Sequence, residues 1–257
     1  MKKSLFVLFS VLVVSVMVLA ACTTPTAAPT AAPVVTEAPT EAPPPEPTAI
    51  PFETCGTAEK PCVITFVPSA EVGKITVAGQ GIADWLQAET GLYFQIEVGT
   101  SFAASIEAMG AKKAQIGFLN TFSVLLADAK YGIDPALASV RKLAVNELSP
   151  DKDLVGTMQP YYRGQFITRV ETGIASLADL KGKTFCFVDP NSTSGYIIPN
   201  IVMKANGIDA EAGDVTATMA GSHPNVGVAV YKGDCDAGVT YIDIRKDESA
   251  KLCETYP

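Results

Sequence analysis

Histidine and basic side chains are scarce in this sequence of 257 residues. One histidine and the absence of any Cys-x-x-Cys spacing leave too few clustered ligands for a zinc site. The 19 basic side chains are outnumbered by 27 acidic ones, and a net charge of −8 is unsuited to neutralising nucleic-acid phosphates. A single long apolar run excludes a bundle of membrane helices. We therefore expect no metal, no cofactor and no nucleic-acid partner, but the apolar fraction of 48% is enough for a buried core.

The N-terminus has the layout of a secretory signal. Two lysines precede a short apolar stretch, and small residues then lead to Cys22. The tetrapeptide Leu-Ala-Ala-Cys that ends at Cys22 resembles the bacterial lipobox. We expect a lipoprotein signal peptide at 1–21 and a lipid on Cys22 that anchors the mature chain to a membrane. The folded part would then lie at the outer face of the cell membrane or in the periplasm. The alternative is a retained signal anchor in which Cys22 is incidental.

A proline-rich segment follows the predicted lipidation site. Residues 23–51 hold nine of the 18 prolines and contain neither glycine nor an aromatic residue. This composition cannot bury enough surface to fold, and it favours extended polyproline geometry. With Cys22 it forms a predicted linker at 22–51, which would reach roughly 90 Å if fully extended. It is either a stalk for a folded head or a leader without consequence.

Five cysteines remain for the folded part, and an extracytoplasmic location permits disulfides. Cys55 and Cys62 bracket a short loop that a disulfide could close. Cys235 and Cys253 could join the late segments of the chain. Cys186 would then be left over as a buried apolar residue between two phenylalanines. The sequence does not fix this pairing.

From residue 52 onward, short apolar runs alternate with segments in which apolar residues recur at helical spacing. Strands are predicted at 63–67, 94–98, 115–119, 165–170, 184–188 and 237–241, and helical segments at 82–89, 103–109, 177–180 and 196–205. This alternation predicts an α/β fold with parallel strands in two lobes. The predicted divisions are lobe 1 (52–130), an inter-lobe connection (131–160), lobe 2 (161–242) and the start of a return to lobe 1 (243–257).

Small or hydroxylated residues follow the first three predicted strands. They are Ser69, the stretch from Thr100 to Phe102, and the stretch from Asn120 to Ser123 that includes Thr121. In parallel sheets ligands bind beyond the carboxyl ends of the strands. These residues therefore predict one lip of a ligand-binding cleft.

The densest group of hydroxyls is Ser192-Thr193-Ser194-Gly195, between a predicted strand and a predicted helix. Side-chain donors and the free N–H groups of a helix N-terminus can hold an oxyanion there without a cation. The alternative is an ordinary serine or threonine helix cap. Pro199 would remove one hydrogen bond from the first turns of this helix.

Longer motifs around these residues resemble the phosphate-, phosphite- and phosphonate-binding proteins of ABC transporters. The matching stretches are 67–69, 99–108, 176–183, 187–196, 221–223 and 236–238. The resemblance implies a two-lobed periplasmic-binding-protein fold of type II that closes on a phosphorus oxyanion and delivers it to an ABC permease. By the same resemblance the chain ends at the start of its return to lobe 1, as a truncated version of the fold.

The resemblance also implies roles for individual residues. Ser192, Thr193 and Ser194 would donate to the anion, with His223 as a further donor. Asp243 would select ligands by accepting from P–OH or pairing with an amine, unless it is a solvated loop charge. Phe102 stands where the family often has an aromatic hydroxyl, so one donor from lobe 1 is absent. The predicted ligand-binding residues are Ser69, Phe102, Thr121, Ser192, Thr193, Ser194, Gly195, His223 and Asp243.

Three classes of function remain open at the sequence level. The first is a lipid-anchored solute-binding protein, and the second is a ligand-sensing module for a membrane receptor. The third is a phosphoester-acting enzyme, in which His223 would need Asp236 or Asp243 as an orienting acid. The sequence contains neither a Gly-x-Ser-x-Gly elbow nor a metal-ligand cluster, so we expect no catalytic residues. His223 could also be a structural histidine.

Overall fold

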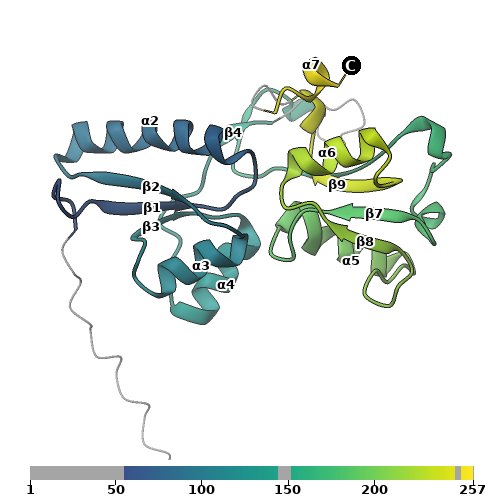
Figure 1. The fold of residues 1–257 in the computed structure, drawn as a ribbon, viewed down its shortest axis with the longest axis horizontal. Helices are drawn as coiled ribbons and strands as arrows, with labels where there is room; N and C mark the ends of the chain where they lie inside the picture. Colours follow the sequence, from purple (N-terminus) through teal and green to yellow (C-terminus); the bar gives the residue numbers. More distant parts are fainter. Residues whose placement is uncertain (1–54, 144–151, 247–249, 257) are drawn as a thin grey trace, which may run out of the picture. The chain divides into compact units, whose positions relative to one another are not determined.

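The structure is a computed structural model (Figure 1). The described residues are 55–143, 152–246 and 250–256. Outside them lie the predicted signal peptide (1–21), Cys22 and the linker (22–51). Internal contacts divide the chain into 1–52 and 53–257, and every element described belongs to the second unit. Within these described ranges, no helix is long and apolar enough to cross a membrane.

The first sheet has three parallel strands in the order β2-β1-β3. Its strands are β1 (Cys62–Phe66), β2 (Phe94–Val98) and β3 (Ile116–Phe118), connected by α2 (Val72–Thr90) and α3 (Phe102–Gly110) and followed by α4 (Thr121–Tyr131). The central strand aligns Ile64 with Ile96 on one side and with Ile116 on the other. Helix α2 covers one face of the sheet, and α3 and α4 cover the other (Figure 1). The parallel arrangement predicted from the sequence is confirmed.

Polar side chains cap the helices that leave the carboxyl ends of this sheet. The Ser101 hydroxyl accepts from the Ala104 N–H at 3.1 Å and begins α3. The Asn120 carbonyl oxygen Oδ1 accepts from the Ser123 N–H at 3.0 Å and begins α4. Such caps satisfy first-turn donors that have no acceptor within the helix. They fix the strand-to-helix turns at the end of the sheet where a ligand is expected.

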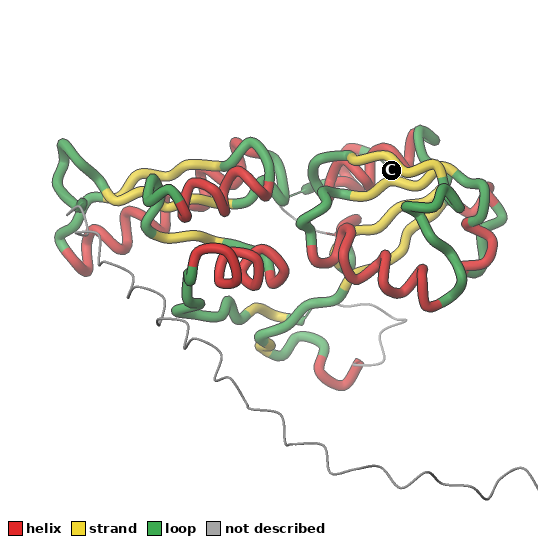
Figure 2. Tube along the Cα trace, turned by 90° about the horizontal axis from the view of Figure 1, so that it is seen from below, coloured by secondary structure: helices red, strands yellow, loops and turns green. Residues whose placement is uncertain are grey.

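The second sheet has four strands in the order β6-β9-β7-β8. They are β6 (Gly164–Thr168), β7 (Thr184–Phe187), β8 (Thr216–Met219) and β9 (Ala237–Tyr241). Strands β7, β8 and β9 are parallel, and β6 pairs with β9 in the antiparallel direction. Helix α5 (Ile198–Ala205) lies on one face and α6 (His223–Lys232) on the other. Figure 2 shows the strands of both sheets in yellow, with helices packed against them.

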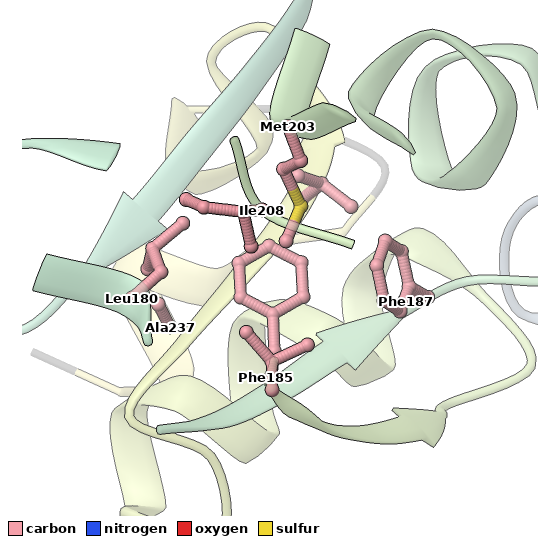
Figure 3. Close-up of a cluster of buried hydrophobic side chains, with 8 residues drawn as sticks. Leu180, Phe185, Phe187, Met203, Ile208 and Ala237 are labelled. Atoms are coloured by element: carbon pink, nitrogen blue, oxygen red, sulfur yellow. The ribbon is translucent and has the colours of Figure 1, made fainter. Parts of the chain in front are cut away.

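An aromatic core holds the second sheet to α5. Phe185 and Phe187 lie two residues apart on β7, so both side chains project to the same face, with ring centroids 4.7 Å apart. Figure 3 shows them with the other residues of this cluster, which are Leu180, Met203, Ile208, Val215, Ala237 and Val239. Burying each large side chain contributes about 1.5–3 kcal/mol, so this core accounts for much of the stability of the second sheet.

A second cluster joins the part of the chain from β1 to α4, called the first half below, to the part from β6 onward, called the second half. Cys186, Val188, Val226, Val230 and Cys235 come from the second sheet and its surroundings. Val67, directly after β1, and Phe102, the first residue of α3, come from the first half, and Phe102 is only 1% exposed. The aromatic side chain expected to line a cleft is therefore part of an apolar contact between the two halves.

Two disulfides are present among the described residues. Cys55 is bonded to Cys62, as the sequence predicted. The second bond joins Cys186 to Cys235, so the expected pair of Cys235 with Cys253 and the expected free Cys186 are both wrong. The reason is the strand order: β7 and β9 are neighbours, which brings Cys186 beside the turn that precedes β9. Cys253 is free and exposed.

Short elements connect and follow the two sheets. They are β4 (Arg141–Lys142), η1 (Lys152–Leu154), β5 (Met158–Gln159), η2 (Val170–Thr172), η3 (Leu177–Leu180), η5 (Ile244–Lys246) and α7 (Leu252–Thr255). Strands β4 and β5 pair in the antiparallel direction within the expected inter-lobe connection. After α7, the Tyr256 ring lies 5.3 Å from the ring of Tyr231 on α6. The lobe boundaries at 130, 160 and 242 stay predictions.

Candidate functional site

The site begins with a tight turn at the carboxyl end of β7. The Asp189 carboxylate accepts from the Asn191 N–H at 2.8 Å, and the Asp189 carbonyl accepts from the Ser192 N–H at 2.9 Å. Ser192 then caps the following helix, because its hydroxyl oxygen accepts from the Gly195 N–H at 3.2 Å. The turn thus aims the chain from a buried strand directly into a helix N-terminus.

The first turn of that helix is a wide π-turn, η4 (Thr193–Ile197), which continues into α5. Pro199 has no N–H to give to the preceding turn. The Gly195 carbonyl instead accepts from the Val188 N–H at 3.0 Å. The expected loss of a helical hydrogen bond at Pro199 is therefore accommodated by the wider turn. The amides of Thr193 and Ser194 stay in the first turn, where no carbonyl of the helix can accept from them.

Gly195 is required by close packing. A Cβ atom built at this position would lie 2.4 Å from Val188 Cγ2 and 2.8 Å from Ser192 Oγ. Both distances are shorter than ordinary contacts of a Cβ atom with carbon or oxygen. Any larger residue would therefore displace the Ser192 hydroxyl that caps the helix. Gly195 acts through the geometry of the turn.

His223 is the first residue of α6 and is 4% exposed. Its Nδ1 accepts from the Tyr241 N–H at 3.1 Å, so the ring proton is on Nε2. Nε2 lies 3.5 Å from Ser192 Oγ. Burial lowers the pKa of His223 to about 4, which keeps the ring neutral at pH 7. Since Nε2 already carries a proton, it can donate to Ser192 or to a ligand but cannot take the proton of Ser192.

Among the buried side-chain atoms of the second half without a hydrogen-bond partner in the described ranges are oxygens of two predicted ligand-binding residues, Ser194 and Asp243. The Ser194 hydroxyl belongs to a residue that is 4% exposed, and its backbone packs against Gly164 of β6. Asp243 Oδ2 belongs to a residue that is 8% exposed, and the Asp243 N–H donates to Gln165 Oε1 at 3.1 Å. An unsatisfied buried polar group costs about 1–3 kcal/mol. The unused donor, the Ser194 hydroxyl, belongs to a residue that packs against Gly164 of β6. The unused acceptor, Asp243 Oδ2, belongs to a residue bonded to the next residue of that strand, Gln165.

Asp243 is therefore a buried carboxylate, which rules out the alternative of a solvated loop charge. Its backbone has a positive φ of 57°, a conformation that is uncommon for residues other than glycine. That backbone conformation, together with the hydrogen bond that the Asp243 N–H donates to Gln165 Oε1, fixes the residue just after the end of β9. The position is compatible with the selectivity role that the family resemblance implies.

Thr193 differs from the expectation that it donates to an anion. Its hydroxyl accepts from the Phe122 N–H at 2.8 Å and donates its one hydrogen to Asn120 Oδ1, also at 2.8 Å. Both partners lie in the first half of the chain, at the start of α4. In this arrangement Thr193 joins the two halves and has no hydrogen left for a ligand.

The residues expected from the first half take different places. Ser69 contributes its carbonyl, which accepts from the His223 N–H at 3.2 Å. Thr121 is exposed in the first turn of α4. Phe102 is buried in the apolar cluster between the halves. Asn120, which the sequence placed in the predicted lip of the cleft but not among the individual ligand-binding residues, caps α4 and accepts from the Thr193 hydroxyl.

Two cavities among the described residues lie away from these groups, on either side of α7. One of about 150 Å³ is lined by Arg169, Tyr231, Arg245 and Cys253, among others. The second, of about 240 Å³, is lined by residues that include Glu71, Lys74 and Asn225. Neither is lined by Ser192, Thr193, Ser194 or Gly195, and Ser192 and Ser194 are 1% and 4% exposed. No group of three histidine, cysteine or acidic side chains suited to a metal occurs in the described part of the chain.

Comparisons with known proteins agree on one family. The family model described as the periplasmic substrate-binding protein of the phosphonate ABC transporter matches residues 64–253. The chain is 27% identical over 182 residues to the phosphate-import protein PhnD of Mycolicibacterium smegmatis. That match covers 68% of this chain and 53% of the relative, so the chain spans about half the length of the curated relative.

Two solved structures show the same fold. One is a binding protein component of an ABC phosphonate transporter from Pseudomonas aeruginosa, with a TM-score of 0.59 and 20% identity over 75% of this chain and 63% of that one. The second is PhnD1 from Prochlorococcus marinus in complex with methylphosphonate, with a TM-score of 0.59 and 16% identity over 75% of this chain and 69% of that one. The two-lobed α/β fold of type II periplasmic binding proteins, expected from the sequence, is confirmed.

Proposed function

The chain belongs to the periplasmic phosphonate substrate-binding family of ABC transporters, and on this premise we propose that it binds a phosphorus oxyanion at the Ser192 turn. The ligand is phosphonate, phosphite or phosphate, bound between the two halves of the fold. The protein delivers it to an ABC permease in the membrane. It does so from outside the cytoplasm, held to the membrane by a lipid on Cys22.

The observation that carries this proposal is the buried Ser194 hydroxyl, which has no hydrogen-bond partner among the described residues and lies at the N-terminus of a helical segment that runs to Ala205. A buried hydroxyl normally finds a partner, so an unused one at such a position favours a ligand acceptor. The partial positive charge of the helix N-terminus adds to the attraction for an anion. Ser192 contributes in the same way, because its oxygen accepts from Gly195 and its own hydrogen is free to be donated.

Asp243 narrows the chemistry of the ligand. A carboxylate beside an anion is repulsive unless it accepts a hydrogen bond from the ligand. Hydrogen phosphate and monoprotonated phosphonate carry a P–OH that can make this bond. An oxyanion without a proton cannot. The unpartnered Asp243 Oδ2 therefore favours a ligand that brings both acceptors and one donor.

The enzyme alternative has an observation against it. Serine hydrolysis by Ser192 would need a base that takes the serine proton. His223 Nε2 cannot serve, because the Tyr241 N–H occupies Nδ1 and leaves the ring proton on Nε2. The family is one of transporter substrate-binding proteins, which also favours binding without turnover.

The test is the affinity of the full chain, purified in detergent, for methylphosphonate and phosphate by titration calorimetry. Ser194→Ala removes one hydrogen bond to a charged group, which is worth about 1.5–3 kcal/mol, and should weaken binding roughly 10- to 150-fold. Ser176→Ala is the matched control, because Ser176 is exposed and its hydroxyl bonds to Asp179. Equal affinities of Ser194→Ala and the unaltered chain would refute the proposed site.

A further inference from the structure

A chain of hydrogen bonds fixes the orientation of the Asn120 side chain. The Phe122 N–H donates to the Thr193 hydroxyl, which must then donate its hydrogen to Asn120 Oδ1. The Ser123 N–H donates to the same Oδ1 at 3.0 Å. Because a backbone N–H can only donate, the oxygen of the amide is identified without ambiguity. The amide nitrogen occupies the other position.

That nitrogen, Asn120 Nδ2, is buried and has no hydrogen-bond partner in the described part of the chain. It carries two hydrogens. It belongs to the same planar group as the oxygen that contacts Thr193, so it lies beside the Ser192 turn. Buried amide nitrogens are rarely left unpaired, and a cap alone uses only the oxygen.

We propose that Asn120 is the ligand-binding donor of the first half of the chain, with Nδ2 donating to an oxygen of the bound oxyanion. This inference rests on the proposed function. It assigns to Asn120 the role of the donor whose absence at Phe102 the sequence indicated. The same amide holds Thr193 by its oxygen and the ligand by its nitrogen, so one side chain couples contact between the halves to occupancy of the site.

The charge of this donor has a consequence for selectivity. A neutral amide offers hydrogens and accepts nothing at Nδ2. The ligand oxygen facing Asn120 must therefore be an acceptor, while the oxygen facing Asp243 bears the proton. The two residues together recognise a monoprotonated oxyanion in one orientation.

Asn120→Asp tests this role, because the carboxylate is nearly the same size and keeps the oxygen that caps α4. Aspartate is as good a helix cap as asparagine, so we expect the melting temperature to change little. The substitution replaces the donor by an anionic acceptor, and affinity for methylphosphonate should fall by about 100-fold or more. The measurement is titration calorimetry on the full chain in detergent, at 0.15 M salt.

Leu125→Asp is the control for added negative charge, since Leu125 is exposed on the same helix. It should weaken binding less than about 3-fold, because an exposed charge is screened at this ionic strength. Equal losses of affinity in the two variants would mean that added negative charge alone explains the effect of Asn120→Asp, and this would overturn the inference. Unchanged binding by Asn120→Asp, with the unaltered chain binding normally, would overturn it while leaving the proposed function intact. No binding by the unaltered chain would overturn both.

A second measurement does not depend on the variant folding. In the full chain labelled with ¹⁵N-asparagine, the two side-chain amide protons of Asn120 should shift on addition of methylphosphonate, because a new acceptor contacts Nδ2. The Leu125→Asp chain should show the same shift. Unchanged Asn120 side-chain resonances at saturating ligand would contradict the assignment.

Discussion

The two halves of the described chain differ in how they are built and in what they contribute. The second half packs Phe185 and Phe187 under its sheet and holds the Ser192 turn, His223 and Asp243. The first half has a smaller, three-stranded parallel sheet and contributes Val67 and Phe102 to the cluster shared by the two halves. The second half thus carries most of the proposed binding groups, and the first half adds contacts at its strand ends.

The two halves therefore need different tests. Substitutions in the second half change stability and the site together, because the strands that form its core also position the turn. The polar contacts between the halves include the hydrogen bonds of Thr193 with Asn120 and Phe122, and the bond from the His223 N–H to the Ser69 carbonyl. Changes there should alter affinity with little effect on folding.

Each half contains one disulfide, and removing the one in the second half should lower the free energy of unfolding more than any other change considered below. Cys186 and Cys235 enclose a sequence separation of 49 residues, and Cys55 and Cys62 one of 7. By loop-closure entropy, replacing both cysteines with alanine should lower the free energy of unfolding by about 4 kcal/mol for the first pair and about 2 kcal/mol for the second.

Denaturant unfolding followed by circular dichroism measures both losses. Trp85 is the one tryptophan of the chain and lies in the first half, so its fluorescence reports separately on that half. An equal or larger loss on removal of the Cys55–Cys62 bond would contradict the loop-closure argument for the difference between the two disulfides.

The next effect is a pH dependence that originates in the second half. Burial lowers the pKa of His223 from 6.5 to about 4, so the unfolded chain binds a proton more readily than the folded one between these values. Stability is fully present above pH 6.5 and should fall by about 3 kcal/mol as the pH drops to 4. In His223→Gln this part of the slope should be absent, as measured by denaturant unfolding between pH 4 and 7. An unaltered slope in the variant would show that another group is responsible.

The smallest effect concerns the contact between the halves. Thr193→Val keeps the shape of the side chain and removes the hydroxyl that joins Phe122 to Asn120. A neutral hydrogen bond is worth about 1 kcal/mol, so ligand affinity should fall about 5-fold. Thr193→Ser should restore it, because serine supplies the same hydroxyl. Normal affinity of the valine variant, measured by calorimetry, would mean that this contact does not contribute to binding.

Much of the fold could be predicted from the sequence, because apolar runs bounded by glycine, proline and polar residues identify buried strands. The predicted strands at 94–98 and 237–241 match β2 and β9. Strand β8 was missed, since all four of its residues are exposed and it has no apolar run. Helix α2 begins at Val72, ten residues before its predicted start. The first turns were missed because Val72 and Val77 are exposed and do not follow the apolar stripe on which the prediction relied.

The details of the candidate site depended on contacts that no local pattern reveals. The sequence located the Ser192 turn, since three hydroxyls and a glycine between a strand and a helix form a recognisable motif. It could not assign the Thr193 hydroxyl to Asn120, which lies 73 residues earlier. The Cys186–Cys235 bond was missed for the same reason, because it depends on the order of strands in the sheet.

The most direct test of the account is calorimetric titration of the full chain with methylphosphonate, phosphite, hydrogen phosphate and sulfate at pH 7. Hydroxyls, amides and the Asp243 carboxylate together predict binding of at least one phosphorus oxyanion that carries a proton. Sulfate has no proton to give Asp243 and should bind at least about 100-fold more weakly, since the carboxylate would lack a donor. No heat with any of the phosphorus oxyanions, from a chain whose cooperative unfolding shows that it is folded, would contradict the account.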